Sequence, residues 1–85
     1  MSPGVTIRVR LWAQLRDAAS CGEWELELPA GSTVATGLES VYARFPKIRE
    51  WDRSLLLAVG TEYALRTQVL CEGDELSLMP PVQGG

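Results

Sequence analysis

The sequence predicts an α+β domain in which a mixed sheet of four to five strands carries one main helix on one face. Residues 5–11 and 23–28 alternate apolar and polar side chains, which is typical of strands with one buried face. Residues 34–45 instead repeat apolar side chains with the period of an amphipathic helix. The chain has 85 residues, which is enough for one domain with a modest core.

The first two strands are expected to be joined by a short helix. The apolar side chains of the first strand are Val5, Ile7, Val9 and Leu11. The two alternating sets of the second strand are Trp24, Leu26, Leu28 and Glu23, Glu25, Glu27. We interpret the glutamates as a solvated face rather than a metal site. Residues 13–20 are rich in helix formers and stop before Gly22, so the connection is helical rather than a tight turn.

The main helix begins after residues 29–31, a Pro-Ala-Gly break, where Ser32 or Thr33 can cap it. Its apolar stripe consists of Val34, Leu38, Val41, Tyr42 and Phe45. Pro46 ends the helix, because the residue before a proline avoids the helical conformation. Gly37 lowers helix stability by about 1 kcal/mol relative to alanine, and would allow a close approach of the helix to the sheet.

The second half of the chain supplies the remaining strands. Residues 47–54 are expected to form a polar connection, and the apolar run at 55–59 predicts a strand covered on both faces. Residues 60–63 and 72–74 carry turn signals, with a short irregular segment between them, and 75–79 alternates again. The predicted order is strand, strand, helix, strand, short strand, strand. This order suits a β-grasp whose first and last strands are parallel and central.

Composition argues against several functions. With a net charge of -3 and scattered basic residues, the chain lacks the clustered positive face of a nucleic-acid-binding protein. It has no histidine, no metal-ligand spacing and no apolar run near the ~20 residues of a membrane span. The N-terminus lacks a secretory signal, so we expect a cytoplasmic protein. Cys21 and Cys71 are interpreted as small buried hydrophobes, and Trp12, Trp24 and Trp51 as packing at the core or its edge.

The most specific feature is the C-terminal segment Pro80, Pro81, Val82, Gln83, Gly84 and Gly85. Prolines lack the N–H donors that a paired strand needs, so we expect a domain of residues 1–79 followed by a flexible tail of residues 80–85. Glycines have no side chains, so the tail can enter a narrow tunnel as backbone and carboxylate. No catalytic set of side chains can be assembled elsewhere. The expected reactive group is therefore the carboxylate of Gly85.

Several segments resemble the small subunit of molybdopterin synthase, a MoaD-like protein of the MoaD/ThiS family of sulfur carriers. These segments are residues 9–16, 28–34, 58–63, 73–75 and the tail at 80–85. Trp12 stands where that family usually has phenylalanine, Gly60 where asparagine is more frequent, and Gln83 where serine or alanine is commoner. The resemblance spans nearly the whole chain, and the proline-containing tail is its specific part.

This resemblance implies a ubiquitin-like β-grasp fold and a sulfur carrier of molybdenum cofactor biosynthesis. It implies that an E1-like adenylating enzyme uses ATP to adenylate Gly85, and that a sulfurtransferase then converts the adenylate to a thiocarboxylate. The tail of Pro80, Pro81, Val82, Gln83 and Gly84 would then insert into the large synthase subunit, where sulfur passes to a pterin precursor. Two small and two large subunits are implied, and the chain itself binds no cofactor or metal.

Strand parity indicates where a partner would bind. Met79 points opposite to Leu76 and Leu78, and Leu56 is out of phase with its apolar neighbours. We interpret Met79 and Leu56 as an exposed apolar pair beside the tail, which would serve as a docking patch. The alternative is that loops cover both side chains.

Alternatives to the molybdenum pathway stay open at this point. Sulfur carriers for thiazole formation, for cysteine synthesis and for tRNA thiolation share the Gly-Gly end, although the two prolines favour molybdenum cofactor biosynthesis. A ubiquitin-like protein modifier would instead join Gly85 to a target lysine through an isopeptide bond. In a plain interaction domain, the tail would have no role.

Overall fold

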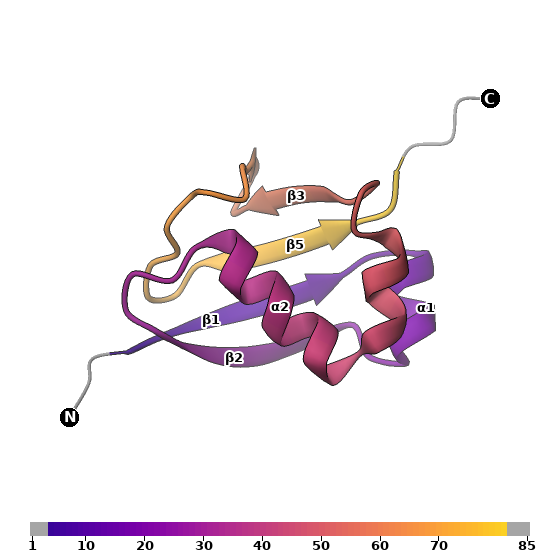
Figure 1. The fold of residues 1–85 in the computed structure, drawn as a ribbon, viewed down its shortest axis with the longest axis horizontal. Coiled ribbons are helices and arrows are strands. Elements are labelled where there is room, and N and C mark those ends of the chain that lie inside the picture. The colour runs from indigo at the N-terminus through magenta and orange to yellow at the C-terminus, as the bar shows by residue number, and fades with distance from the viewer. Residues whose placement is uncertain (1–3, 82–85) are drawn as a thin grey trace.

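The computed structural model describes residues 4–81, which form five strands, two α-helices and one 3-10 helix (Figure 1). The order of elements is β1 (Gly4–Leu11), α1 (Gln14–Ala19), β2 (Glu23–Pro29), α2 (Val34–Arg44), η1 (Pro46–Trp51), β3 (Leu56–Val59), β4 (Glu62–Tyr63) and β5 (Glu75–Met79). The short helix and the main helix predicted from the sequence are present as α1 and α2. No helix within these residues is long and apolar enough to cross a membrane.

β1 and β5 occupy the centre of the sheet, as the sequence predicted. The strand order is β2-β1-β5-β3-β4. β1 and β5 run parallel, with Val9 opposite Leu76 and Leu11 opposite Leu78. The other pairs, β1 with β2, β3 with β5 and β3 with β4, are antiparallel. The sheet is therefore mixed and has the β-grasp order.

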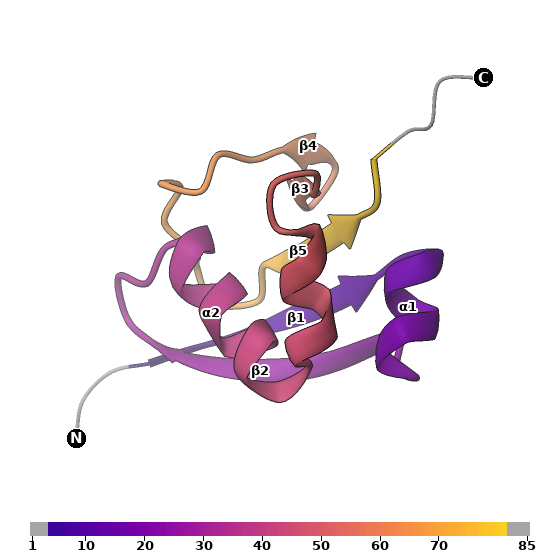
Figure 2. The same cartoon turned by 45° about the vertical axis from the view of Figure 1, so that its right-hand side comes forward.

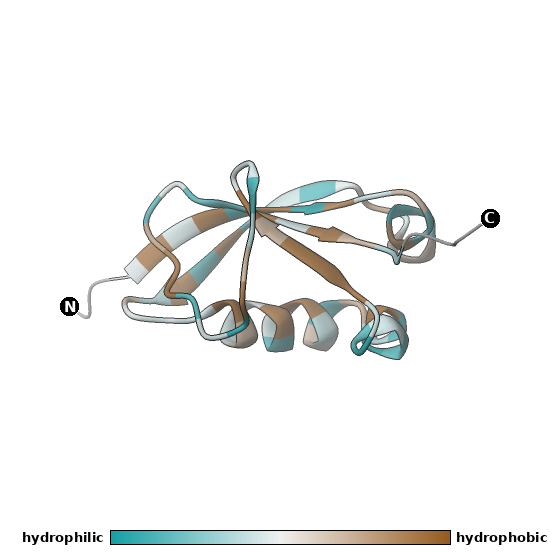
Figure 3. Cartoon of the chain, turned by 90° about the horizontal axis from the view of Figure 1, so that it is seen from above, coloured by the Kyte–Doolittle hydropathy of each residue, from teal (hydrophilic) through white to brown (hydrophobic). Residues whose placement is uncertain are grey.

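α2 lies along one face of the sheet and closes the core (Figure 3). Side chains from both layers are almost fully buried between them: Ile7, Val9, Leu11, Val34, Leu38, Val41, Leu76 and Leu78. A Cβ added to Gly37 would lie 3.4 Å from side-chain atoms of Leu70 and Leu76. Helix and sheet are therefore close at Gly37, but a Cβ there would make ordinary contacts, so the approach does not require glycine.

The segments around α2 refine the sequence predictions. Thr33 is the residue that caps α2, since its hydroxyl accepts the N–H of Thr36 at 3.4 Å. After α2, η1 lies between α2 and α1 (Figure 2), where the sequence predicted only a polar connection. Ile48 of η1 is fully buried. The turn predicted at residues 60–63 is shorter in the structure, because Glu62 and Tyr63 already form β4.

Candidate functional site

The face of the sheet opposite α2, which we call the outer face, contains every second residue of its strands. In the register of β3 and β5, Leu56 lies opposite Met79 and Ala58 lies opposite Ser77. β4 places Tyr63 opposite Ala58. These residues have the opposite parity to the buried leucines of the same strands, so they share the outer face.

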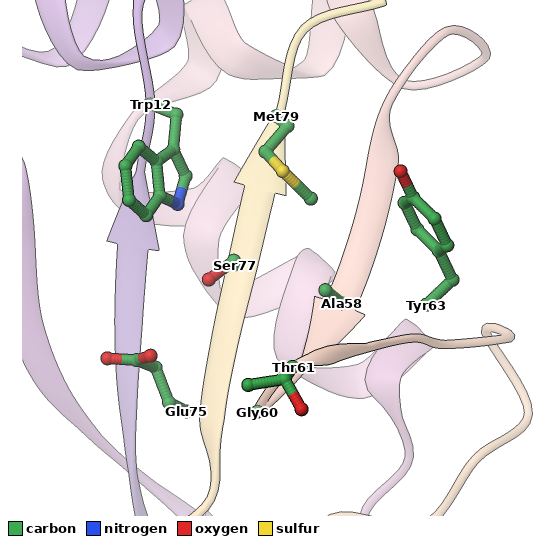
Figure 4. A pocket seen from close by; sticks show the side chains of 8 residues that line it. All are labelled: Trp12, Ala58, Gly60, Thr61, Tyr63, Glu75, Ser77 and Met79. Atoms are coloured by element: carbon green, nitrogen blue, oxygen red, sulfur yellow. The ribbon is translucent and has the colours of Figure 1, made fainter.

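An open hollow of about 290 Å³ lies in the outer face (Figure 4). Its lining residues are Trp12, Ala58, Gly60, Thr61, Tyr63, Glu75, Ser77 and Met79. Ala58 and Ser77 are 8% and 5% exposed, although neither faces the core. The larger side chains of Trp12, Tyr63 and Met79 stand around them (Figure 4). A floor of small residues with large walls suits an apolar anchor from a partner protein.

Trp12 is a wall of this hollow and not part of the core. Its side chain is 41% exposed, because the alternation of β1 continues for one residue beyond the strand. The backbone N–H of Trp12 donates to the carbonyl of Leu78 at 3.2 Å, and the guanidinium carbon of Arg10 lies 4.5 Å from the ring centroid. The expectation that Trp12 packs at the core was therefore wrong, whereas Trp24 and Trp51 do pack against the core.

Met79 and Leu56 lie side by side on the outer face, as strand parity predicted. Both are half-buried. Leu56 also lines a second open hollow together with Tyr63 and Leu65. Tyr63 is 79% exposed and Leu65 is 75% exposed. The predicted pair thus belongs to a larger surface, which we call the apolar patch: Trp12, Leu56, Tyr63, Leu65 and Met79. That a partner binds at Met79 and Leu56 stays a prediction.

Charged residues border the apolar patch on the same face. Arg8 Nη1 lies 3.1 Å from Glu23 Oε2, and Arg10 Nη1 lies 3.6 Å from Glu75 Oε1. The hydrogen bond to Glu23 and its negative charge raise the pKa of Arg8. The glutamates of β2 are all exposed, as expected of a solvated face: Glu23, Glu25 and Glu27. The outer face therefore has a charged region over β1 and β2 and an apolar region toward β3 and β4.

Neither cysteine is the buried hydrophobe that the sequence indicated. Cys71 is exposed, Cys21 is half-buried, and both are free thiols. Cys71 begins the turn before β5, where its N–H donates to the carboxylate of Asp74 at 2.8 Å. This turn position points the side chain away from the core, so Cys71 contributes to neither the core nor a disulfide.

The tail begins at the apolar patch. Pro80 and Pro81 directly follow Met79 at the end of β5, and both are half-buried. The other predicted tail residues lie outside the described residues: Val82, Gln83, Gly84 and the proposed reactive residue, Gly85. The tail therefore begins directly after Met79, one member of the apolar patch.

Three comparisons connect these features to known proteins. A family model described as the ThiS family matches residues 9–85. A molybdopterin synthase sulfur carrier subunit from Arabidopsis thaliana is 32% identical over 81 residues, covering 95% of this chain and 84% of the relative. A solved structure of molybdopterin converting factor subunit 1 from Pyrococcus furiosus has a TM-score of 0.83 at 30% identity, covering 92% of this chain and 99% of that chain.

A second solved structure bears on the fold alone. It is a complex of subunits 1 and 2 of the molybdopterin-converting factor from Helicobacter pylori, in which the matching chain has a TM-score of 0.67 at 20% identity. The match covers 95% of this chain and 100% of that chain. Together the comparisons confirm the ubiquitin-like β-grasp fold and the resemblance to the small subunit of molybdopterin synthase. The chain belongs to the ThiS family, and the family match includes its tail.

Proposed function

We propose that this chain is the sulfur carrier subunit of a molybdopterin synthase and carries sulfur on Gly85. The observation that supports this function most is the similarity to molybdopterin synthase sulfur carrier subunits, and the family match, which runs from residue 9 through Gly85, includes the whole tail. The Arabidopsis relative of that name aligns with 95% of the chain. The apolar patch adds a docking surface at the point where the tail leaves the sheet.

The chemistry proposed for Gly85 is activation followed by exchange of oxygen for sulfur. An E1-like partner holds ATP so that a carboxylate oxygen attacks the α-phosphorus and pyrophosphate leaves. A carboxylate is a poor acyl donor, but the resulting acyl adenylate has AMP as a good leaving group. Sulfur at the oxidation level of sulfide, delivered by the sulfurtransferase, then attacks the acyl carbon, so that a C–S bond forms as the C–O bond to AMP breaks and the product is a thiocarboxylate. A side chain at Gly84 or Gly85 would crowd the approach of the reacting atoms to about 3–3.5 Å.

The loaded tail is proposed to enter the large subunit of the synthase, where sulfur passes to a pterin precursor. The Helicobacter structure is a complex of subunits 1 and 2, and we extend that pairing to this chain. In this proposal the apolar patch binds the large subunit while residues 80–85 reach its catalytic pocket. The assembly holds two copies of each subunit, and the E1-like enzyme and the sulfurtransferase act on the chain in turn.

Loading of the tail tests this function. The purified chain, first checked by intact mass to end at Gly85, is incubated with ATP, the E1-like enzyme and the sulfurtransferase of the source organism. We expect the intact chain to gain the mass difference between sulfur and oxygen. A variant lacking Gly85 should keep its circular dichroism spectrum and remain unloaded. Loading of the truncated variant would contradict the proposal.

A pull-down with the same two proteins separates the alternative fates of Gly85. Recovery of the large synthase subunit and an adenylating enzyme supports the molybdenum pathway. Recovery of a thiazole synthase or a tRNA-thiolating enzyme would place the carrier in another pathway, and lysine-linked conjugates would identify a protein modifier. Full function after loss of Gly84 and Gly85 would indicate a plain interaction domain.

A further inference from the structure

Three side chains from separate elements meet in a cluster that we call the clasp: Tyr42 of α2, Asp52 after η1, and Arg66 between β4 and β5. The hydroxyl of Tyr42 donates to the carboxylate of Asp52. Arg66 Nη1 donates to the same carboxylate oxygen at 2.9 Å, and Arg66 Nη2 donates to the backbone carbonyl of Asp52. The guanidinium of Arg66 therefore binds both the side chain and the backbone carbonyl of Asp52.

The backbone around Arg66 also makes hydrogen bonds, to the start of α2. The N–H of Ala35 donates to the carbonyl of Arg66, and the N–H of Val34 donates to the carbonyl of Gln68, both at 2.9 Å. These are donors that the first turn of a helix leaves without partners inside the helix. The segment 64–69 is thus joined to the start of α2 by its backbone and to the end of η1 by Arg66.

Immediately before Arg66 the chain forms part of the apolar patch. Tyr63 and Leu65 are the two most exposed members of the patch, at 79% and 75%. Tyr63 belongs to β4, which has only two residues and pairs with β3 at two positions. A strand this short is weakly held by its own ladder. The N–H of Ala64 adds one bond to β3, to the carbonyl of Leu57 at 2.9 Å, and beyond it the side chain of Arg66 is the next anchor along the chain.

We propose that Asp52 and Arg66 are positioning residues that hold Tyr63 in the wall of the apolar patch, so that partner affinity depends on a contact outside the patch. This inference rests on the proposed function, in which the patch binds the large synthase subunit. The side chains of Asp52 and Arg66 are 38% and 41% exposed, and ion pairs this exposed contribute little to global stability. Breaking the pair removes one anchor of residues 62–67 and leaves the backbone bonds to α2, so this segment should open locally more often while the core stays folded.

A double-mutant cycle between clasp and patch tests the proposal. Arg66→Met removes the guanidinium and keeps an unbranched apolar side chain, and Tyr63→Ala removes the wall. We expect each variant to lose roughly three- to tenfold in affinity for the large subunit, measured by isothermal titration calorimetry. The double variant should lose no more than Tyr63→Ala alone. The proposal would be overturned if the affinity losses of the two single variants multiply in the double variant. It would also be overturned if Arg66→Met binds with wild-type affinity.

Matched variants separate positioning from a general loss of stability. Arg53→Met removes an exposed arginine beside Asp52 and should bind as the wild type does, while Arg66→Lys should recover only part of the affinity. Amide hydrogen exchange at 62–67 should rise in Arg66→Met and not in Arg53→Met. Faster exchange throughout the core of Arg66→Met would overturn the proposal in favour of a purely stabilising clasp.

The outcome is also distinguishable from failure of the carrier function. If Tyr63→Ala binds the large subunit normally, the tyrosine wall has no role in docking and the positioning proposal falls. Sulfur loading of Gly85 by the E1-like enzyme in the same preparation would still support the carrier function. Absence of loading would count against the function itself.

Discussion

The two faces of the sheet come from the same strands but have different compositions and different roles. Toward α2, Leu76 and Leu78 are completely buried. Between and after them on β5, Ser77 and Met79 face the other way and line a hollow. Since neighbouring residues of a strand point to opposite faces, a shift of one position separates the residues that stabilise the fold from those available to a partner. Substitutions at adjacent positions should therefore have different consequences.

The largest difference is expected between Leu78→Ala and Met79→Ala in the free energy of unfolding. Leu78 is fully buried among side chains of the core, so its truncation leaves a cavity and should cost about 2–5 kcal/mol. Met79 is half-buried at an open hollow and should cost less than half as much. Urea unfolding of both variants measures this. Equal losses would show that the outer face is part of the stabilising core.

Binding should show the reverse order, with Met79→Asp as the most damaging change on the outer face. A carboxylate at this position would be desolvated against an apolar partner, so affinity for the large subunit should fall by about 2 kcal/mol or more. Ala43→Asp is the matched control, since it adds the same charge at an exposed position of α2. Unchanged affinity of Met79→Asp, by calorimetry, would remove Met79 from the docking surface.

Much of the fold could be predicted because alternation reports directly on burial. The parity that separates Leu78 from Met79 is visible in the order of residues and is present in the structure. The apolar run at 55–59 shows no alternation, and the expectation that it is covered on both faces was wrong, because Leu56 lies half-buried on the open outer face. η1 could not be predicted in this way. Ile48 is its one fully buried side chain among the described residues, and a single buried residue establishes no period.

The site was less predictable because its members come from the ends of elements and from distant parts of the chain. Trp12 follows the last residue of β1, and a large aromatic residue is normally interpreted as core. Tyr63 belongs to a strand of two residues, which is too short to show alternation. Arg66 meets Asp52 across 14 positions, and no local pattern connects two charged residues over that distance.

The core side also has a titratable group, and Tyr42→Phe should reveal it at high pH. Burial, and then the hydrogen bond to Asp52, raise the pKa of Tyr42 above its usual value of 10.0. The stabilisation from its protonated form is complete below pH 10 and is lost as pH rises toward the higher pKa of the folded state.

Above about pH 10 the wild type should therefore lose free energy of unfolding as pH rises, whereas Tyr42→Phe should lose less over the same range. At neutral pH the free energy of unfolding of Tyr42→Phe should be lower by about 1 kcal/mol, because the variant lacks one hydrogen bond. Urea unfolding across this range measures both effects. Parallel curves for the two proteins would show that Tyr42 does not govern the alkaline loss.

The smallest effect is expected from Arg8→Gln on the outer face. Arg8 lies 3.1 Å from Glu23, but the two side chains are 49% and 43% exposed. Water and salt screen an ion pair in this position, so its loss should leave the melting temperature unchanged in both low and high salt. A clear fall in low salt that disappears in high salt would show that the charged region stabilises the fold. The division between a stabilising face and a binding face would then apply to the apolar patch alone.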